Sequence, residues 1–157
     1  MIKNCRSCNS KKLHKLINLK KIHFSGKFPK KKQKIKKGFL ELIICSRCKL
    51  TQLSKNFSLK YMYDINYCYR SGINETMKNH LSNITKKISK LIKLKNGDLV
   101  LDIASNDGTL LNSYKSKNII TLGIDPTIKK YKKYYNNINY KISDFFNSNN
   151  YFLKTKY

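Results

Sequence analysis

The apolar residues from position 73 onward recur at helical spacing. Successive steps of three and four residues place them on one stripe of a helix. The stripe consists of Ile73, Met77, Leu81, Ile84, Ile88, Leu91 and Ile92. Ser71 or Asn74 can cap the start of this helix, and Asn96-Gly97 supplies a stop. The pattern therefore predicts one amphipathic helix over residues 73–92.

Shorter segments of alternating character follow this helix. Leu99–Ala104 is apolar on both faces apart from Asp102, which is typical of a strand in a parallel sheet. The predicted elements are the strand 99–104, a helix over 107–114, a strand over 119–124, a helix containing Ile128, Tyr131 and Tyr135, and a weak strand over 138–142. This order predicts an α/β fold, the first half of a Rossmann-like, doubly wound sheet.

Residues 1–72 differ in texture from the rest of the chain. They carry paired cysteines, a lysine-rich middle and an aromatic cluster, with little clear periodicity. Lys27–Lys37 is the most basic stretch, and repulsion among its like charges favours a solvated loop. We therefore expect a small module over residues 1–72, followed by a linking helix and an α/β segment over residues 73–157.

Two Cys-x2-Cys pairs occur in the first module. Cys5 and Cys8 form one pair, Cys45 and Cys48 form the other, and 36 residues lie between the pairs. A Cys-x2-Cys turn lets two thiolates reach one zinc ion, and two such turns complete a tetrahedral shell. A complete shell suits a structural site rather than a catalytic one. The spacing therefore predicts one structural Zn2+ bound by these four cysteines.

Other readings of the cysteines stay open. Chance thiols or a disulfide are alternatives to zinc, although no oxidising compartment is implied. His14 and His23 lie between the pairs, so a shell of three cysteines and one histidine is conceivable. Cys68 stands outside the pattern and is interpreted as a packed thiol.

The charge of the chain at first suggests a nucleic-acid partner. The net charge is +26, but only Arg6, Arg47 and Arg70 among the 34 basic residues are arginines. Recognition of bases and phosphates favours the bidentate fork of arginine. Lysines spread along the whole chain therefore indicate compositional drift of solvated positions, with an anionic partner as the alternative, and argue against nucleic acid.

The chain shows no sign of a membrane segment. No apolar run approaches the roughly 20 residues needed to span a bilayer, and the first residues do not resemble a secretory signal. We expect a soluble, cytoplasmic protein.

Asp102 to Gly108 falls where a predicted strand gives way to a helix. Such a turn presents backbone amides to a ligand. Gly108 is the only glycine at the fingerprint positions of dinucleotide-binding loops, with Ala104 and Asn106 at the others. Adenosylmethionine has no phosphate, and its loop tolerates these departures better than a pyrophosphate site would. Asp102 or Asp107 would then face the methionine ammonium or an ordered water.

Asp125 ends the second predicted strand, 17 residues after Gly108. A carboxylate at that point can accept hydrogen bonds from both ribose hydroxyls. The alternative role is a helix cap, which Pro126-Thr127 would allow. Loop and acid together predict an S-adenosylmethionine site. Its predicted residues are Asp102, Ala104, Ser105, Asn106, Asp107, Gly108, Asp125 and Pro126.

This series of motifs resembles the sugar C-methyltransferases of deoxysugar biosynthesis, in which a zinc-binding domain precedes an adenosylmethionine-binding domain. The resemblance covers nearly all of the 157 residues. It is carried by the paired cysteines with Leu50, Gln52 and Leu53 after them, by Tyr67-Cys68-Tyr69-Arg70-Ser71, by His80, by residues 102–111 and by Gly123-Ile124-Asp125-Pro126.

The resemblance implies a nucleotide-diphosphate sugar as substrate, typically a 4-keto deoxysugar whose enolate attacks the methyl group. By analogy, the substrate-binding residues are Tyr67, Tyr69, Ser71 and His80. Aromatic packing under the zinc module is an equal alternative for the tyrosines. The family continues past this length, so we expect the general base beyond Tyr157 and a chain that is inactive alone. We also expect self-association through an unpaired sheet edge at Leu99–Ala104.

Two rival functions remain. A zinc-ribbon nucleic-acid-binding protein would account for the paired cysteines and the charge, and it predicts steeply salt-dependent binding. It would leave Asp102–Gly108 and Asp125 without a purpose. The other rival is a non-catalytic partner or regulatory remnant of a methyltransferase.

Overall fold

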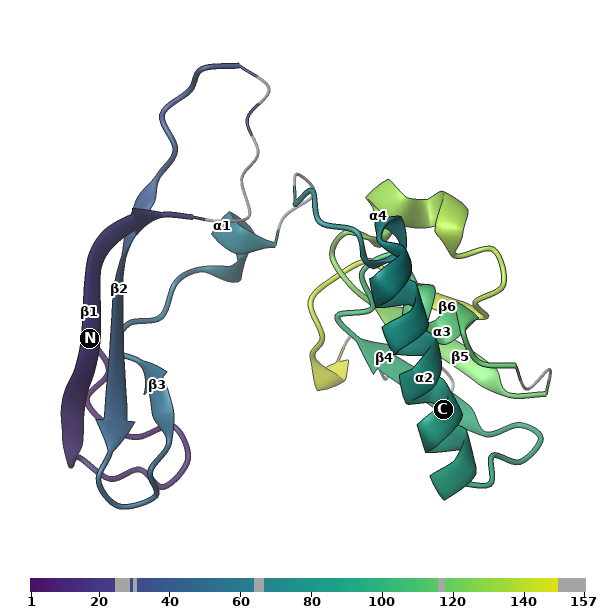
Figure 1. Ribbon diagram of the computed structural model, residues 1–157, viewed down its shortest axis with the longest axis horizontal. Coiled ribbons are helices and arrows are strands. Elements are labelled where there is room, and N and C mark those ends of the chain that lie inside the picture. The colour runs from purple at the N-terminus through teal and green to yellow at the C-terminus, as the bar shows by residue number, and fades with distance from the viewer. Residues whose placement is uncertain (25–28, 30, 64–66, 116–117, 150–157) are drawn as a thin grey trace. The chain divides into compact units, whose positions relative to one another are not determined.

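The computed structural model describes the chain except for residues 25–28, 30, 64–66, 116–117 and 150–157 (Figure 1). Contacts between residues divide the chain into two compact units, Met1–Met62 and Tyr63–Tyr157. Within the described residues each unit contains a three-stranded sheet, antiparallel in the first unit and parallel in the second. The protein is therefore a mixed α/β chain with two small sheets.

The first unit is built on an antiparallel meander in the order β1-β2-β3, followed by a short helix. The elements are β1 (Leu13–His23), β2 (Lys37–Cys45), β3 (Thr51–Leu53) and α1 (Leu59–Met62). The sequence did not predict these strands, because β1 is exposed along almost its whole length. Its register with β2 also shifts between Lys15 and Ile17 and again between Asn18 and Lys21, which breaks the alternation typical of a strand.

Strand β2 carries the buried face of this sheet. Glu41, Ile43 and Cys45 are buried at alternating positions of the strand, so Cys45, its last residue, lies in the interior. The buried Glu41 carboxylate accepts a hydrogen bond from Asn18 Nδ2 at 3.2 Å and lies 3.9 Å from Lys15 Nζ. These partners offset part of the cost of removing a charge from water.

Aromatic side chains close the end of the first unit away from the cysteines. Phe24 packs edge-to-face against Phe57 at 5.4 Å and stacks on Tyr61 at 6.1 Å. Gly38 permits this packing, because a Cβ there would approach Phe57 to 2.9 Å. In the stretch predicted as a solvated loop, residues 31–36 form neither helix nor strand and are mostly exposed, whereas residues 27, 28 and 30 lie outside the described part.

The second unit contains a parallel sheet in the order β4-β5-β6. Its strands are β4 (Leu99–Ile103), β5 (Ile120–Ile124) and β6 (Tyr140–Ile142). In their register, Leu101 pairs with Leu122, and Leu122 pairs with Tyr140. All three strands were predicted at these positions. The carboxyl ends of β4 and β5 lie side by side, where Ile103 pairs with Ile124.

Helices connect these strands and precede them. The helical elements are η1 (Ser71–Ile73), α2 (Glu75–Leu91), α3 (Thr109–Asn112), α4 (Ile128–Tyr131) and η2 (Lys132–Tyr134). The Asn74 side chain caps α2 by accepting a hydrogen bond from the Met77 backbone N–H. Buried Thr85 joins α2 to the end of α3, since its hydroxyl lies 3.3 Å from the Ser113 carbonyl. The predicted long helix is therefore present and packs against the next helix in sequence.

Two buried apolar clusters hold the second unit together. One cluster packs α3 against α4 and the segment after η2. It consists of Leu111, Ile128, Tyr131, Tyr135 and Ile138. The other joins the strands through Leu122, Ile124 and Ile142. Gly123 lies between Leu122 and Ile124 and faces the first cluster, because a Cβ there would meet Tyr135 at 2.9 Å. Both sides of β5 are thus buried, as a parallel sheet requires.

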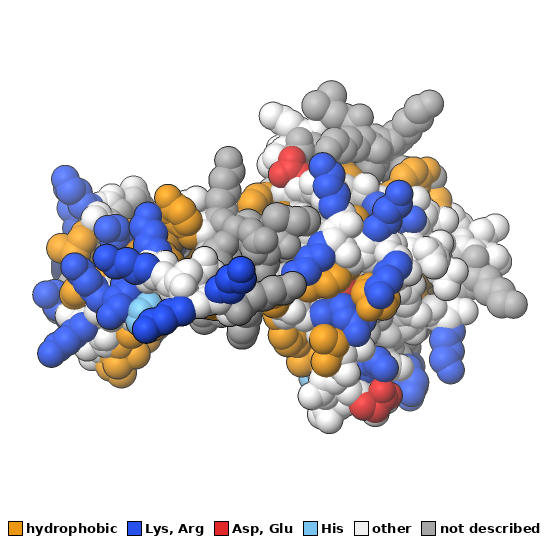
Figure 2. Space-filling view, turned by 90° about the horizontal axis from the view of Figure 1, so that it is seen from above, with side chains coloured by type: hydrophobic (Ala, Val, Ile, Leu, Met, Phe, Trp, Pro, Cys, Tyr) orange, Lys and Arg blue, Asp and Glu red, His pale blue; other side chains and the backbone are white. Residues whose placement is uncertain are grey.

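Lysine and arginine side chains are spread over the surface. On the face shown in Figure 2 they lie on both units and do not gather into one patch. Among the described residues, no helix is both long enough and apolar enough to cross a membrane.

Strand β4 forms an edge of the parallel sheet. Only β5 pairs with it among the described strands, so its outer backbone groups face away from the sheet. Leu101 and Ile103 are 37% and 51% exposed and lie on the same face of this edge. An apolar edge of this kind favours pairing with another strand.

We expect the chain to self-associate through β4. Ile103→Lys places a charge on the exposed apolar face and should weaken association roughly tenfold, measured by sedimentation over a range of concentrations. Ile92→Lys is a matched control, because Ile92 is 57% exposed and follows α2 rather than lying in the sheet. A wild-type chain that stays monomeric would contradict this prediction, as would an equal effect of both variants.

Candidate metal centre and cofactor loop

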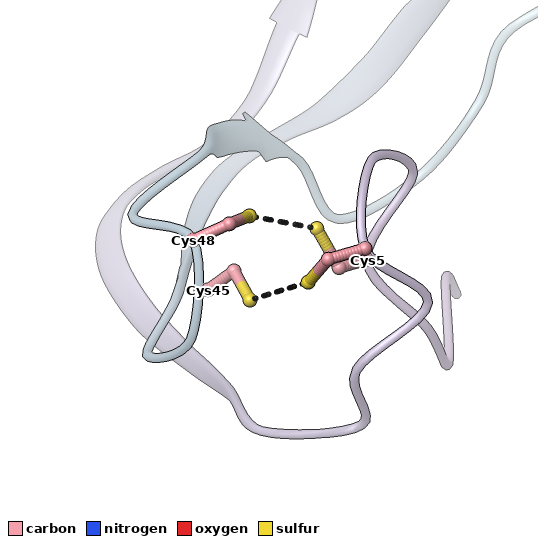
Figure 3. A group of neighbouring side chains, drawn as sticks. Cys5, Cys45 and Cys48 are labelled. Carbon is pink, nitrogen blue, oxygen red and sulfur yellow. Dashed lines mark hydrogen bonds between the residues drawn. The ribbon is translucent and has the colours of Figure 1, made fainter.

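The four paired cysteines converge in the first unit (Figure 3). Their Sγ atoms all lie within 4.8 Å of one another. Cys5 Sγ is 3.5 Å from Cys48 Sγ, and Cys8 Sγ is 3.6 Å from Cys45 Sγ. Four thiolates bound to zinc at the usual bond length would be spaced by about 3.8 Å. The donor set and its spacing therefore fit a tetrahedral zinc ion.

The two Cys-x2-Cys turns have the same backbone conformation. The N–H of Asn9 donates to the Cys5 carbonyl at 3.0 Å, and the N–H of Lys49 donates to the Cys45 carbonyl at 2.9 Å. Asn9 and Lys49 are also both left-handed, with φ of 56° and 62°. Two equivalent turns thus present two thiols each to one point, which is the arrangement that a closed site needs.

Backbone amides inside these turns favour thiolates. The N–H of Cys48 is the largest influence on Cys45 and lowers the pKa of its thiol to about 6. The N–H of Cys8 likewise lowers the pKa of Cys5. The N–H of Ser10 favours the thiolate of Cys8, but burial and the neighbouring thiols outweigh it and raise that pKa to about 11. The cluster therefore already favours some of the thiolates that zinc requires, and metal binding would displace the remaining protons.

The histidines and the fifth cysteine lie apart from this cluster. Among the described residues, the group of side chains able to share one metal ion contains the four cysteines and no histidine. His14 and His23 lie on β1 and are exposed. Cys68 belongs to the second unit, where its Sγ lies 3.8 Å from Lys130 Nζ. The four-cysteine prediction is therefore favoured over the histidine variant.

Gln52 holds the first Cys-x2-Cys turn through a hydrogen bond. It is 5% exposed on β3, and its Oε1 accepts a hydrogen bond from the Arg6 backbone N–H at 3.1 Å. Its Nε2 is buried without a partner in the described part of the chain. Spacing alone gave Gln52 no role, since its contact with Arg6 spans 46 residues.

The loop after β4 has an unusual backbone. Ala104, Asn106 and Gly108 are all left-handed, with φ of 64°, 50° and 76°. A Cβ at Gly108 would lie 2.5 Å from Ile138, so this position needs glycine. The predicted cofactor loop is thus a tight, alternating turn between β4 and α3 rather than an extended segment.

Asp125 ties this loop to the end of β5. Its side chain is buried, and Oδ2 accepts a hydrogen bond from the Asn106 N–H at 3.0 Å. Oδ1 accepts from the N–H and hydroxyl of Thr127 at 2.7 and 2.5 Å. The two parts of the predicted site therefore lie together. The bonds to Thr127 also match the capping role that the sequence left open.

The Asp107 carboxylate is buried against the segment before α2. It is 1% exposed, and Oδ2 accepts hydrogen bonds from the Gly72 N–H at 2.9 Å and from Arg70 Nη1 at 3.4 Å. Oδ1 accepts from the N–H and hydroxyl of Thr109. Asp107 thus anchors the segment before α2 to the loop, and its acceptor positions are filled by the protein itself.

Ser105 and Tyr135 form a buried polar contact beneath the loop. Their hydroxyl oxygens are 2.8 Å apart, and the Tyr135 hydroxyl also donates to the Asn106 carbonyl at 2.9 Å. Burial raises the pKa of Tyr135, so this hydroxyl keeps its proton. Tyr135 therefore holds the loop through its hydroxyl, and the apolar pattern of the predicted helix did not reveal this role.

The predicted substrate residues occupy different surroundings. Asn106 holds the tyrosine segment, since its side chain accepts from the Ser71 N–H at 2.9 Å and donates to the Tyr69 carbonyl at 3.1 Å. The Tyr67 ring is partly buried and the Tyr69 ring is 46% exposed. His80 is exposed on α2. Tyr67, Tyr69 and Ser71 thus lie in one segment beside the loop.

Asp102 is the acid of the loop that the protein leaves without a hydrogen bond among the described residues. Burial and the charge of Asp125 raise the pKa of its carboxyl to about 6. Pro126, beside Asp125, is partly exposed. A partly exposed carboxyl of raised pKa at the end of β4 can accept a proton or a cationic ligand.

We expect Asp102→Asn to stabilise the chain at neutral pH. Folding raises the pKa of this carboxyl to about 6, so the folded chain holds the proton more tightly than the unfolded chain does. The carboxyl therefore lowers the free energy of unfolding progressively as the pH rises to about 6, and the full cost remains at higher pH. Allowing for partial exposure, the variant should gain about 1–2 kcal/mol at pH 7 and nothing below about pH 4. Thermal unfolding across this range measures the difference. Asp98→Asn, at the opposite end of β4, is the control, and an unchanging difference would contradict the assignment.

We expect the purified chain to hold one zinc ion. Cys45→Ser should lose the metal and several kcal/mol of stability in the first unit, because zinc coordination contributes folding energy. Metal analysis together with thermal unfolding, with and without a chelator, tests this. Cys68→Ser is the matched control, since Cys68 lies outside the cluster. Metal-free protein with unchanged unfolding would refute the zinc site.

Comparison with known families agrees with this geometry. Residues 5–63 match the family model Methyltransf_13, whose description is "Putative zinc binding domain". The match includes both cysteine pairs and ends one residue after the first compact unit. No curated protein matches the chain. Residues 5–63 are therefore similar to a family of zinc-binding domains whose name refers to methyltransferases, and they carry the four cysteines positioned to bind a metal.

Proposed function

We propose that this chain is part of an S-adenosylmethionine-dependent methyltransferase that methylates carbon on a nucleotide-diphosphate sugar, with a 4-keto deoxysugar as the expected substrate. In this proposal the zinc module is structural, and the second unit is the first half of a Rossmann-like cofactor domain. The proposal rests most on one contact. The hydrogen bond from the Asn106 N–H to Asp125 Oδ2 holds a β4 loop and a β5 acid together at the carboxyl ends of adjacent parallel strands.

The residues at this point suit adenosylmethionine better than a pyrophosphate cofactor. A pyrophosphate binds best where free amides converge, but the Asn106 amide is already taken by Asp125. Asp125 Oδ2 accepts one bond within the protein and keeps a second acceptor position for a ribose hydroxyl. Asp102 accepts no hydrogen bond from the described part of the chain and can face an ammonium. The site is therefore acidic, as a cationic cofactor would require.

Adenosylmethionine, when bound, would supply an electrophilic methyl group. The chain's own residues would bind and orient it. Asp125 would hold the ribose, and Asp102 would balance the positive charge of the methionine end. The Ser105–Tyr135 contact would keep the loop in its left-handed conformation. These roles concern binding and orientation, and no described residue is assigned as the general base.

The association with sugar substrates has a different basis. It comes from the order of motifs along the chain, and the family match supports its methyltransferase component. The position of the Tyr67–Ser71 segment supports it further. Asn106 holds this segment through the Ser71 N–H and the Tyr69 carbonyl, beside the proposed cofactor loop. A sugar held by this segment would lie close to the cofactor.

We expect Asp125→Asn to weaken binding of adenosylhomocysteine by more than roughly tenfold, because it loses charge-assisted bonds to the ribose. Calorimetric titration of the full chain measures the affinity. Asp98→Asn changes the same charge at the amino end of β4 and should leave the affinity unchanged. Equal affinities of wild type and Asp125→Asn would remove Asp125 from the site, and a wild type without affinity would refute the cofactor proposal.

A further inference from the structure

A cleft lies beside the proposed cofactor loop, within the second unit. Its volume is about 580 Å3. Helix α2 contributes Asn79 and Ser82, and α3 with the residue after it contributes Thr109 and Ser113. Arg70, Lys78, Asp107 and Tyr134 also line it. The cleft thus places hydroxyl and amide groups beside two cations, Arg70 and Lys78, and one buried carboxylate, Asp107.

Arg70 is held in place rather than left to move in solvent. Its side chain is only 19% exposed, and its guanidinium lies 4.2 Å from the centre of the Tyr134 ring. Nη1 makes a long contact of 3.4 Å with Asp107 Oδ2. A guanidinium that stacks on an aromatic ring keeps its in-plane N–H groups available along the edge.

Arg70 makes the longest of the four contacts to the Asp107 carboxylate. Oδ1 accepts from the N–H and hydroxyl of Thr109, and Oδ2 accepts from the Gly72 N–H at 2.9 Å and from Arg70 Nη1 at 3.4 Å. The arginine has five N–H donors, and its ion pair with Asp107 uses one of them. Within the described residues its other N–H groups make no hydrogen bond, so they can bind a ligand in the cleft.

We propose that this cleft binds an oxyanionic group, which the guanidinium fork of Arg70 holds with help from the surrounding hydroxyl and amide groups. The inference rests on the proposed function, which offers two sources of such a group. One is the carboxylate of adenosylmethionine, since Asp107 belongs both to the cofactor loop and to the cleft wall. The other is the diphosphate of the nucleotide sugar. Both are planar or tetrahedral oxyanions that arginine binds bidentately.

The test compares ligands that differ by one oxyanion. Adenosylhomocysteine is paired with its decarboxylated form, which keeps the ammonium and lacks the carboxylate, and uridine diphosphate is paired with uridine, which lacks the diphosphate. Calorimetry on the zinc-loaded chain should show Arg70→Gln weakening binding of the oxyanion-bearing member of one pair roughly tenfold or more, with less than about twofold change for its partner without the oxyanion. The affected pair identifies the source of the oxyanion.

Two controls separate binding from folding. Lys90→Gln removes one positive charge from the exposed end of α2 and should leave all affinities unchanged. Ser82→Leu fills the cleft while keeping Arg70, and it should weaken the same ligand. Asn83→Leu, the next residue and exposed, should not. If Arg70→Gln does not fold, the Ser82→Leu and Asn83→Leu comparison decides the matter.

Failure of this inference differs from failure of the proposed function. If Arg70→Gln lowers the affinity equally for both members of each pair, or for no ligand, the oxyanion site is overturned while the cofactor site stays intact. A wild type that binds neither adenosyl compound but binds uridine diphosphate through Arg70 would overturn the cofactor and keep the cleft. A wild type that binds none of the four ligands would overturn both.

Discussion

The buried carboxylate of Asp107 is the interaction on which the second unit depends. It is 1% exposed and accepts hydrogen bonds from Gly72, Arg70 and Thr109. A carboxylate removed from water is costly unless its acceptor positions are filled, so these contacts must form together. By satisfying Asp107, the chain docks the turn before α2 onto the β4 loop and starts α3. The orientation of the loop and the placement of Arg70 follow from the same contacts.

The first unit depends on a comparable constraint, but there it is the convergence of the thiols. Its sheet has few buried apolar residues, since β1 is exposed along most of its length. Two turns, each ending in a residue of left-handed conformation (Asn9 and Lys49), bring four sulfur atoms together. Such a module has little hydrophobic stabilisation, and metal coordination would supply what the small core does not. This explains why cysteines, rather than apolar residues, end the buried face of β2.

How much could be predicted from the sequence depended on how local each signal was. The helix over 75–91 and the three parallel strands follow from short repeats of apolar residues, and the zinc ligands follow from two fixed spacings. The strands of the first unit escaped prediction because register shifts and exposed positions mask the alternation of β1. Arg70 and Tyr135 also escaped, since their contacts with the loop join residues 29 to 37 apart in sequence. Only folding brings such residues together.

Lysine and arginine occupy different kinds of position in this strongly basic chain. Lysines dominate the exposed surface, where a flexible point charge serves as well as a planar one. Two of the arginines use the guanidinium in a defined contact. Arg6 Nη2 donates to Asn56 Oδ1, and the Arg70 guanidinium lies over the Tyr134 ring. Lysine offers neither a planar stacking surface nor a fork of five donors. Arg70 combines an aromatic contact with a place in the wall of the cleft beside the proposed cofactor loop, where the shape of its cation can be used.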